Sequence, residues 1–314
     1  MNGRGLVWSS KVAHRQRVVG EISVLKYLLM VLGFAMLGAA LACTNRTDSV
    51  PDDHPHLTPN VFVQDVTFHS RALDREMPYR VIRARNPAPG SKLPVVYLLH
   101  GGRGSFRDWS NNTDVARFAE RGLILVMPDG DESWYTNSAE RPRDRYEDYM
   151  TQDLVSDVES RFPVLTGRAN RAIMGVSMGG FGAVKIALRH PELYALVGGL
   201  SSALDAPGRP FSVARIGQYR HYRAIFGPVD SASRRDNDPF VLVSSADPAK
   251  MPYFFLTCGD KEGLLATNRS FARLLEQRHF PYEFQVVAGG HDWQQWSARL
   301  DAVFGSLMDH LAKQ

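Results

Sequence analysis

A single serine stands among small residues in the stretch "RAIMGVSMGGFGAVKIALRHP". Ser177 follows a short apolar run and precedes a segment with helical periodicity, so it lies where a strand becomes a helix. Gly175 and Gly179 flank it in the pattern Gly-X-Ser-X-Gly, which suits a tight turn that exposes a nucleophilic hydroxyl. The following helix would point its positive end at a developing oxyanion. The alternative is a serine in an ordinary strand-to-helix loop.

A serine hydroxyl is a weak nucleophile unless a base accepts its proton. His291, in "VVAGGHDWQQW", follows the last predicted strand and precedes the last predicted helix. This is the place of the base in enzymes whose chain order is Ser, Asp/Glu, His. The other histidines after the leader fall in polar, helical or helix-terminal segments, and His100 is expected to be a structural hydrogen-bonding residue. We therefore predict that His291 is the base.

The base needs a carboxylate that fixes its tautomer and stabilises the imidazolium. The loop "CGDKEGLL" follows a predicted strand and offers both Asp260 and Glu262. Spacing alone does not decide between these two acids. Asp292 is less suitable, because a residue next to His291 does not easily reach the correct ring nitrogen.

Strand and helix patterns alternate along the chain after residue 60. The predicted strands cover residues 60–70, 77–85, 93–100, 123–130, 171–177, 194–201, 253–259 and 282–290. The predicted helices cover residues 114–120, 146–162, 178–189, 264–277 and 293–311. This alternation predicts one α/β domain, with a mostly parallel central sheet and helices on both faces. Residues 203–250 break the rhythm, and we expect an excursion over the carboxyl edge of the sheet.

The first 42 residues read as a secretory signal rather than as part of the fold. Five basic residues and one acidic residue precede an apolar run from Tyr27 to Ala42. That run is shorter than the roughly 20 residues of a comfortable membrane span. We predict a signal peptide at 1–42, a flexible tether at 43–59 and a catalytic domain at 60–314.

The end of the signal allows two kinds of processing. Ala40 to Ala42 could be cut by an ordinary signal peptidase, which would release a soluble periplasmic or secreted protein. The same segment sets Cys43 behind small residues, as in a bacterial lipobox, with Ala40 in place of the common leucine. Because the chain's only other cysteine is Cys258, we favour a lipidated Cys43 that attaches the domain to a membrane.

Charge and motif content exclude several classes of function. The chain has 37 basic and 33 acidic residues, and the part after the signal carries 32 of each sign. The high isoelectric point therefore belongs to the leader, and no electrostatic argument for nucleic-acid binding survives. We see no cluster of metal ligands and no dinucleotide fingerprint, so we expect no metal and no cofactor.

Five segments together resemble a known family. They are "VVYLLHGGRGSFRDW", "LVMPDGDESWYTNS", "GVSMGGFGAVKIALRHPELY", "CGDKEGLLATNRSF" and "GGHDWQQW", in this order over residues 61–311. The chain is similar to the esterase family that includes esterase D, feruloyl esterases, enterochelin esterases and mycobacterial mycolyltransferases. The resemblance implies an α/β-hydrolase fold and a serine nucleophile.

The resemblance also assigns roles to particular residues. Counted from Cys258, the family's acid falls on Glu262, although an aspartate is commoner there. The oxyanion hole would consist of the backbone N–H groups of Gly102, after His-Gly, and of Met178, after the nucleophile. The segment "SWYTNS" resembles one that borders the family's substrate cleft, which makes Trp134 and Tyr135 candidates for substrate binding.

Further aromatic residues fall near the loops of the expected active edge. Trp109 and Trp293 are candidates for stacking on a sugar or a phenolic acyl group. For Trp296 we prefer a place in the core. The arginines of "ERPRDRY" could pair with an anionic substrate, but a solvated loop fits them better.

These features together predict an exported serine esterase that forms an acyl-enzyme intermediate. Its substrate would be a small-molecule or carbohydrate-linked ester. One alternative keeps the site and passes the acyl group to a carbohydrate hydroxyl, as a mycolyltransferase does. A second alternative is a tethered binding protein without turnover, which would have no need for a complete set of nucleophile, base and acid.

Overall fold

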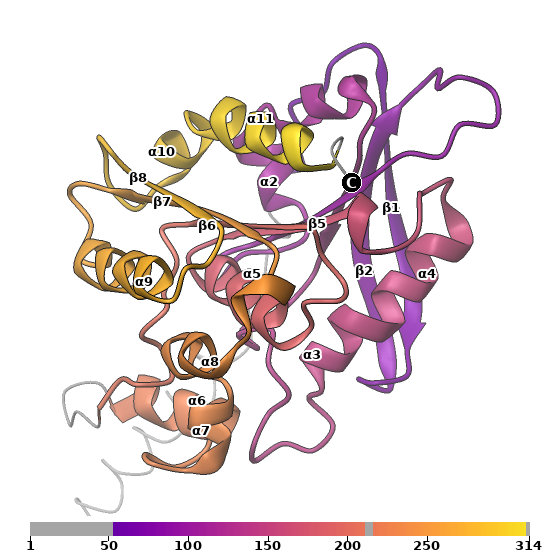
Figure 1. Ribbon diagram of the computed structural model, residues 1–314. Helices are drawn as coiled ribbons and strands as arrows, with labels where there is room; N and C mark the ends of the chain where they lie inside the picture. Colours follow the sequence, from indigo (N-terminus) through magenta and orange to yellow (C-terminus); the bar gives the residue numbers. More distant parts are fainter. Residues whose placement is uncertain (1–52, 211–215, 312–314) are drawn as a thin grey trace, which may run out of the picture. The chain divides into compact units, whose positions relative to one another are not determined.

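The computed structural model describes residues 53–210 and 216–311 (Figure 1). The predicted signal and Cys43 lie outside these residues. An eight-stranded sheet runs through the described residues in the order β1-β2-β4-β3-β5-β6-β7-β8. β2 pairs antiparallel with both β1 and β4, and the pairs from β4 to β8 are parallel. The predicted mostly parallel α/β-hydrolase sheet is confirmed.

The strands follow the apolar runs of the sequence. Their bounds are β1 Val61–Ser70, β2 Arg75–Ala84, β3 Val95–Leu99, β4 Ile124–Pro128, β5 Arg171–Val176, β6 Leu196–Leu200, β7 Tyr253–Gly259 and β8 Tyr282–Val287. Every residue of β3, β4, β5 and β6 is buried. A parallel strand covered on both faces needs apolar side chains on both, which explains these continuous apolar runs.

Helices cover the two faces of the sheet (Figure 1). In the view shown, α2, α10 and α11 lie above β5 to β8, and α5, α8 and α9 lie below. Their bounds are α2 Asp108–Asn112, α5 Met178–Arg189, α8 Pro239–Ser245, α9 Leu265–Gln277, α10 Trp293–Ser297 and α11 Leu300–Leu311. The remaining helical segments are η1 Val115–Arg121, α3 Tyr146–Asp148, η2 Tyr149–Asp153, α4 Leu154–Arg161, η3 Arg168–Asn170, α6 Ile216–Phe226, α7 Ala232–Asp236 and η5 Pro248–Lys250.

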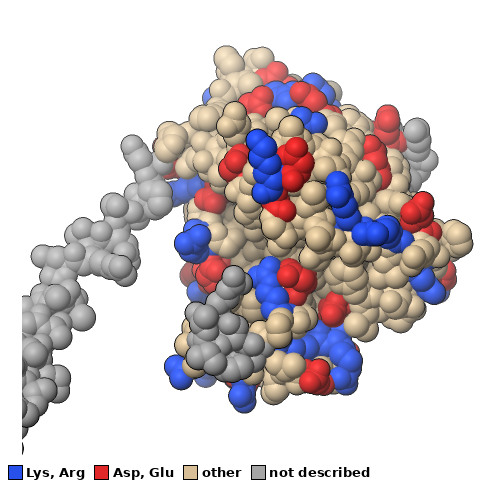
Figure 2. Space-filling view, turned by 90° about the vertical axis from the view of Figure 1, so that its left-hand side faces the viewer, with Lys and Arg blue, Asp and Glu red and all other residues tan. Residues whose placement is uncertain are grey.

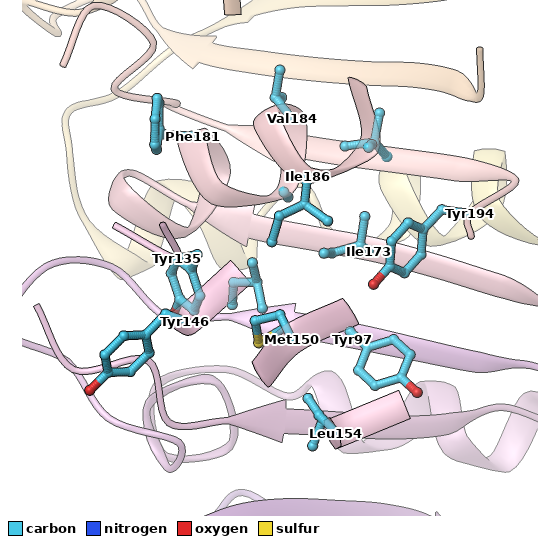
Figure 3. Close-up of a cluster of buried hydrophobic side chains, with 14 of the residues drawn as sticks. Tyr97, Tyr135, Tyr146, Met150, Leu154, Ile173, Phe181, Val184, Ile186 and Tyr194 are labelled. Atoms are coloured by element: carbon cyan, nitrogen blue, oxygen red, sulfur yellow. The ribbon is translucent and has the colours of Figure 1, made fainter. Parts of the chain in front are cut away.

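The sheet separates two hydrophobic cores. Along β3, Val95, Tyr97 and Leu99 belong to one core, whereas Val96 and Leu98 belong to the other. This alternation follows from the two-residue period of a strand. In the first core, Phe181, Val184 and Ile186 of α5 pack together with residues of β3, β5 and the segment 135–154 (Figure 3). The helix α5, which follows Ser177, therefore packs on a continuous apolar surface.

Two predicted boundaries change in the structure. Residues 53–59, expected as the end of a flexible tether, contact the domain. Asp53 accepts a hydrogen bond from the buried Arg80 at 2.6 Å, and the His56 N–H donates to the Ser110 carbonyl at 2.8 Å. The expected helix 293–311 is divided into α10 and α11. The domain therefore begins before residue 60.

The excursion expected over residues 203–250 contains helices in its described part. α6, α7 and α8 fall between β6 and β7, and α8 packs against α5 and α9. Within the described ranges, no helix has the length and apolar content needed to cross a membrane.

Candidate active site

Ser177 lies on a strained turn between β5 and α5. Its backbone has φ 55° and ψ −113°, a left-handed φ that a side chain other than glycine rarely adopts. The turn depends on two glycines. A Cβ on Gly175 would come within 2.2 Å of the Gly179 carbonyl carbon, and one on Gly179 would come within 2.3 Å of the Leu99 carbonyl oxygen. The motif residues thus let β5, α5 and the end of β3 approach closely enough to raise the serine above the sheet.

Two loops bring a histidine and a carboxylate to this serine. The His291 Nε2 atom lies 2.9 Å from Ser177 Oγ, and its Nδ1 atom lies 2.6 Å from Glu262 Oε2. Glu262 follows β7, and His291 follows β8. The three side chains follow three different strands at the same edge of the sheet. Two hydrogen bonds connect them in the order Ser177, His291, Glu262. With Nδ1–H donating to the carboxylate, Nε2 can accept the serine proton.

The structure separates the two acids that spacing left open. Glu262 is buried, whereas the His291 side chain is 39% exposed and faces the cleft. Asp260 is exposed, and its Oδ1 accepts the Gly289 N–H at 3.0 Å. Asp292 caps α10 by accepting the Gln295 N–H at 2.9 Å. Of these three acids, Glu262 is the one that contacts His291.

A glycine-rich loop after β3 faces the serine. A Cβ on Gly101 would lie 3.5 Å from Ser177 Cβ, so this loop passes directly beside the strand-to-helix turn that carries Ser177, which we call the elbow. The buried His100 holds the loop, since its Nδ1 lies 2.7 Å from the Gly101 carbonyl and its Nε2 accepts the Gly130 N–H at 2.9 Å. The Glu132 carboxylate accepts the Arg103 N–H on the other side of Gly102. The Gly102 amide is therefore in a loop fixed at both ends.

A partly buried acid, Asp108, follows this loop as the first residue of α2. Ser105 Oγ donates to Asp108 Oδ1 at 3.0 Å. Burial raises the pKa of Asp108, and the neighbouring His100 opposes that shift.

An open cavity of about 510 Å³ lies in front of Ser177 and His291. Gly102, Trp293 and Trp296 line it, together with the charged residues Arg103, Asp108, Glu132 and Asp292. This volume lies within the range of ordinary small-molecule sites. Figure 2 shows one face of the molecule, on which acidic and basic side chains are interspersed among uncharged residues.

Three of the predicted substrate-binding aromatics are instead core residues. Trp109 is 1% exposed, and its indole N–H donates to the Leu99 carbonyl at 3.0 Å. Tyr135 is fully buried and donates to the His100 carbonyl at 3.1 Å. Trp134, 8% exposed, packs against Phe181, and also against Tyr222 and Phe226 of α6. The prediction that Trp109, Trp134 and Tyr135 bind substrate was wrong.

The backbone explains why Trp134 and Tyr135 turn inward. Both residues have a positive φ, 56° and 50°, so the chain does not continue as the extended loop that would present their rings to the cleft. Trp293 is the predicted aromatic that does line the cavity. Trp109 packs edge-to-face against it, with the ring centroids 5.4 Å apart.

Sequence reasoning missed two contributors to the site. Ser201, at the end of β6, donates to Glu262 Oε1 at 2.6 Å, and nothing in its sequence context marks it. Glu132 lines the cavity; its place just before the "SWYTNS" segment was a signal that could have found it. Trp296 is buried as expected, yet it also lines the cavity.

Cys258 is close to the acid but suits no chemistry of its own. It is buried, and burial together with the charge of Glu262 raises its pKa to about 12. In residues 53–210 and 216–311, no group of three or more His, Cys, Asp or Glu side chains could hold a metal ion.

Comparison with known proteins gives consistent matches over most of the chain. A family model described as "Putative esterase" matches residues 70–307. An acetyl esterase of Caldicellulosiruptor saccharolyticus is 25% identical over 257 residues, which cover 77% of this chain and 96% of that protein. The diacylglycerol acyltransferase/mycolyltransferase Ag85A of Mycobacterium leprae is 24% identical over 320 residues, which cover 91% of this chain and 93% of that protein. The solved structure of a ferulic acid esterase superimposes with a TM-score of 0.69 at 25% identity, and the match covers 80% of this chain and 99% of that one.

Proposed function

The chain belongs to the esterase family whose model it matches, and on this premise we propose that it hydrolyses carboxylic esters with Ser177 as nucleophile. The observation that carries the proposal is the hydrogen-bonded line from Ser177 through His291 to Glu262. An acetyl esterase and a ferulic acid esterase among the similar proteins support ester chemistry.

The first half-reaction transfers the acyl group to the protein. Ser177 Oγ attacks the ester carbonyl carbon while His291 Nε2 accepts the hydroxyl proton. Glu262 keeps the imidazole in the required tautomer and stabilises the imidazolium. The tetrahedral intermediate then breaks its bond to the alkoxy oxygen. His291 returns the proton to that oxygen. The alcohol then departs, and the acyl group remains on Ser177 as an ester.

The second half-reaction releases the acid. A water molecule gives its proton to His291 Nε2 and attacks the acyl carbon. The bond to Ser177 Oγ breaks, and the serine recovers its proton from His291. In both halves we propose that the Gly102 and Met178 amides donate to the oxyanion. Loss of one such donor typically lowers the rate by roughly a hundredfold or more.

The cavity sets bounds on the substrate. Its size fits a small acyl group or a single aromatic ring, and Trp293 supplies a face for ring contact. Arg103 and Glu132 at the same cavity give it both signs of charge. We therefore propose a short or phenolic acyl group.

Turnover of chromogenic esters tests this proposal. The domain from Asp53 onward would be assayed on nitrophenyl esters of increasing chain length and on methyl ferulate, beside Ser177→Ala. We expect activity in the wild type and loss of at least three orders of magnitude in the variant, roughly the cost of removing a triad nucleophile. A folded wild type that turns over none of these esters would favour the binding protein or the acyltransferase.

Acyl transfer is the second candidate, and a second cavity favours it. This cavity, of about 430 Å³, shares Glu132 with the first. Its walls carry donors and acceptors suited to hydroxyl groups, among them Arg75, Asp131, Arg141, Arg143, Tyr146 and His221. Because the two cavities share Glu132, we propose that a carbohydrate bound in the second one offers a hydroxyl to the acyl-enzyme. The mycolyltransferase relative supports this chemistry.

Partitioning of the acyl-enzyme separates the two reactions. The enzyme would be acylated with a nitrophenyl ester in the presence of increasing glucose or trehalose. A hydrolase gives free acid at every sugar concentration. Accumulation of an acyl sugar, together with a faster breakdown of the acyl-enzyme as the sugar concentration rises, would instead establish the transferase.

We also propose that the protein is exported and attached to a membrane through a lipidated Cys43. The support is the basic and apolar leader that ends at this cysteine. Labelled palmitate fed to the native host tests it: label in the wild type and none in Cys43→Ser is the expected result. Cleaved, unlabelled wild-type protein would overturn lipidation and leave simple secretion.

A further inference from the structure

The carboxylate of Glu262 has more than one partner. Its Oε2 faces His291, while its Oε1 accepts the Ser201 hydroxyl at 2.6 Å and the Gly259 N–H at 2.7 Å. Two donors on one oxygen fix the rotation of the carboxylate plane and leave the other oxygen for the imidazole. Both Ser201 and Glu262 are buried, so water does not replace these donors.

The Ser201 hydroxyl is itself held in place. The Trp296 indole Nε1–H donates to Ser201 Oγ at 2.9 Å. Because this oxygen accepts from the indole, its own proton is directed to Glu262. The same indole ring stands edge-to-face against His291, with ring centroids 5.0 Å apart. Trp296 thus contacts the base directly and reaches the acid through the serine.

The backbone of Ser201 points to a requirement for its side chain. Its φ is 50°, in the left-handed region that glycine adopts without strain. Glycine would suit the backbone better, so a serine at this position has a conformational cost. The Ser201 N–H donates to the Thr257 carbonyl at 2.7 Å, which holds the residue in this conformation.

We propose that Ser201 and Trp296 are positioning residues that orient the Glu262 carboxylate toward His291, acting in series from the indole through the serine hydroxyl. The inference rests on the proposed serine-esterase function. Its consequence is that the longer acid side chain, with one more rotatable bond than aspartate, is held in a single orientation during both half-reactions.

The neighbouring residue Ser202 offers a matched control. Ser202 is also fully buried, and its hydroxyl has no hydrogen-bond partner among the described residues. Ser202→Ala therefore removes the same atom from the adjacent position without touching Glu262. For the test, Ser201→Gly is better than Ser201→Ala, because glycine relieves the positive φ and so offsets part of the stability that is lost with the two hydrogen bonds of the hydroxyl.

The first measurement is kcat and KM for a nitrophenyl ester in wild type, Ser201→Gly and Ser202→Ala. We expect a roughly tenfold lower kcat with an unchanged KM in Ser201→Gly, the usual scale for a hydrogen bond to a charged group. The low-pH limb of kcat/KM should move to higher pH, because a carboxylate with fewer donors holds the imidazolium proton more tightly. Ser202→Ala should match the wild type.

Other charged groups near His291 are the same in all three proteins, so a shift of the pH limb comes from the lost hydroxyl. Those on the adjoining loops are Asp260, Glu262 and Asp292, and those that line the cavity are Arg103, Asp108 and Glu132.

The second measurement tests the order of the contacts. Trp296→Phe keeps an aromatic ring but loses the N–H donor. If the indole acts through the serine, this substitution lowers kcat in the wild type and has little further effect in Ser201→Gly. Equal losses in both backgrounds would overturn the serial arrangement.

A readout without substrate separates failure of this inference from failure of the proposed function. The His291 Nδ1 proton gives an NMR resonance whose position and exchange depend on the bond to Glu262. We expect it to change in Ser201→Gly and to stay in Ser202→Ala. An inactive wild type would contradict the esterase proposal alone. An active wild type with kcat, pH profile and this resonance all unchanged in Ser201→Gly would overturn the positioning role.

Discussion

Two glutamates are buried among the residues that the structure describes, and they are held in opposite ways. Glu147 is 3% exposed and Glu262 is 8% exposed. Glu147 contacts three side chains that carry or can carry positive charge, at 2.6–2.9 Å: Lys185, Arg189 and His190. Glu262 contacts two neutral donors and His291. The Glu147 carboxylate is held by a fixed cluster of cations. The Glu262 carboxylate gains a cationic partner only when His291 accepts a proton.

The charge cluster belongs to the scaffold under the elbow. Lys185 lies in the middle of α5 and also donates to the Tyr135 carbonyl at 2.7 Å, so it joins the elbow helix to the segment 135–147. Burial alone would raise the pKa of Glu147, but Lys185 and His190, with Arg189, outweigh it and hold the pKa well below its usual range. Glu147 therefore remains ionised and keeps the same partners. Glu262, in contrast, contacts a base that gains and loses a proton during the reaction.

Neutralising Glu262 should have the largest effect on activity. Glu262→Gln presents an amide to His291 and disfavours the required tautomer. We expect kcat/KM to fall by roughly 10³- to 10⁴-fold while the unfolding temperature changes little. Steady-state kinetics and thermal unfolding measure both, with Asp260→Asn as the control that should match the wild type. Loss of activity in Asp260→Asn and its retention in Glu262→Gln would reverse the assignment.

Neutralising Glu147 should have the largest effect on stability. Glu147→Gln leaves Lys185 buried without its counter-charge, and removal of one partner of a buried ion pair typically costs about 3–5 kcal/mol. Urea unfolding would measure the loss. The activity per folded molecule should stay within a few-fold of the wild type. Glu140→Gln, which breaks an exposed pair with Arg223, is the control and should change stability little. A Glu147→Gln variant that is fully stable but inactive would erase the contrast between the two glutamates.

Acid should act on the scaffold through Glu147. Because its folded-state pKa is below the ordinary value of 4.5, its contribution to stability is present above that pH and is lost as the pH falls further. The unfolding free energy of the wild type should therefore fall more steeply between pH 5 and 3, by roughly 1–3 kcal/mol, than that of Glu147→Gln. Parallel pH dependences in the two proteins would contradict the charge cluster.

The aromatic residues beside each glutamate should differ in the same way, with smaller effects. Trp293 packs against Trp296 on the Glu262 side, and Trp293→Ala should raise KM for methyl ferulate several-fold. The Tyr135 carbonyl accepts a hydrogen bond from Lys185, the partner of Glu147. Tyr135→Phe, which loses the hydroxyl bond to the His100 carbonyl, should cost about 1 kcal/mol of stability with KM unchanged. A raised KM in Tyr135→Phe, with none in Trp293→Ala, would restore Tyr135 to the substrate site.

The elbow and its partners were accessible from sequence because they are encoded locally. Gly175 and Gly179 are demanded by close backbone contacts two residues from Ser177, so they appear as a motif. His291 follows a strand that is recognisable by its apolar run, and so do the two candidate acids Asp260 and Glu262, between which the family resemblance chose Glu262. Their meeting is then a consequence of parallel strands ending at one edge of the sheet.

The rest depends on contacts that spacing does not encode. Glu147 meets cations that come some 40 residues later in the sequence, and its one signal was Lys185 as a lone charge in the apolar run "GAVKIAL". Trp134 and Tyr135 were misplaced because two successive positive φ angles turn them into the core. Ser201 was missed because a single serine after a strand has no distinguishing pattern.

Covalent labelling of Ser177 tests the central claim most directly. Wild type, Glu262→Gln and Glu147→Gln would be mixed with a nitrophenyl ester, quenched in acid at successive times and analysed by peptide mass spectrometry. We expect one acyl group on the peptide that contains Ser177, formed rapidly in wild type and Glu147→Gln and very slowly in Glu262→Gln. Turnover with the acyl group on another residue, or equal acylation rates in all three proteins, would contradict it.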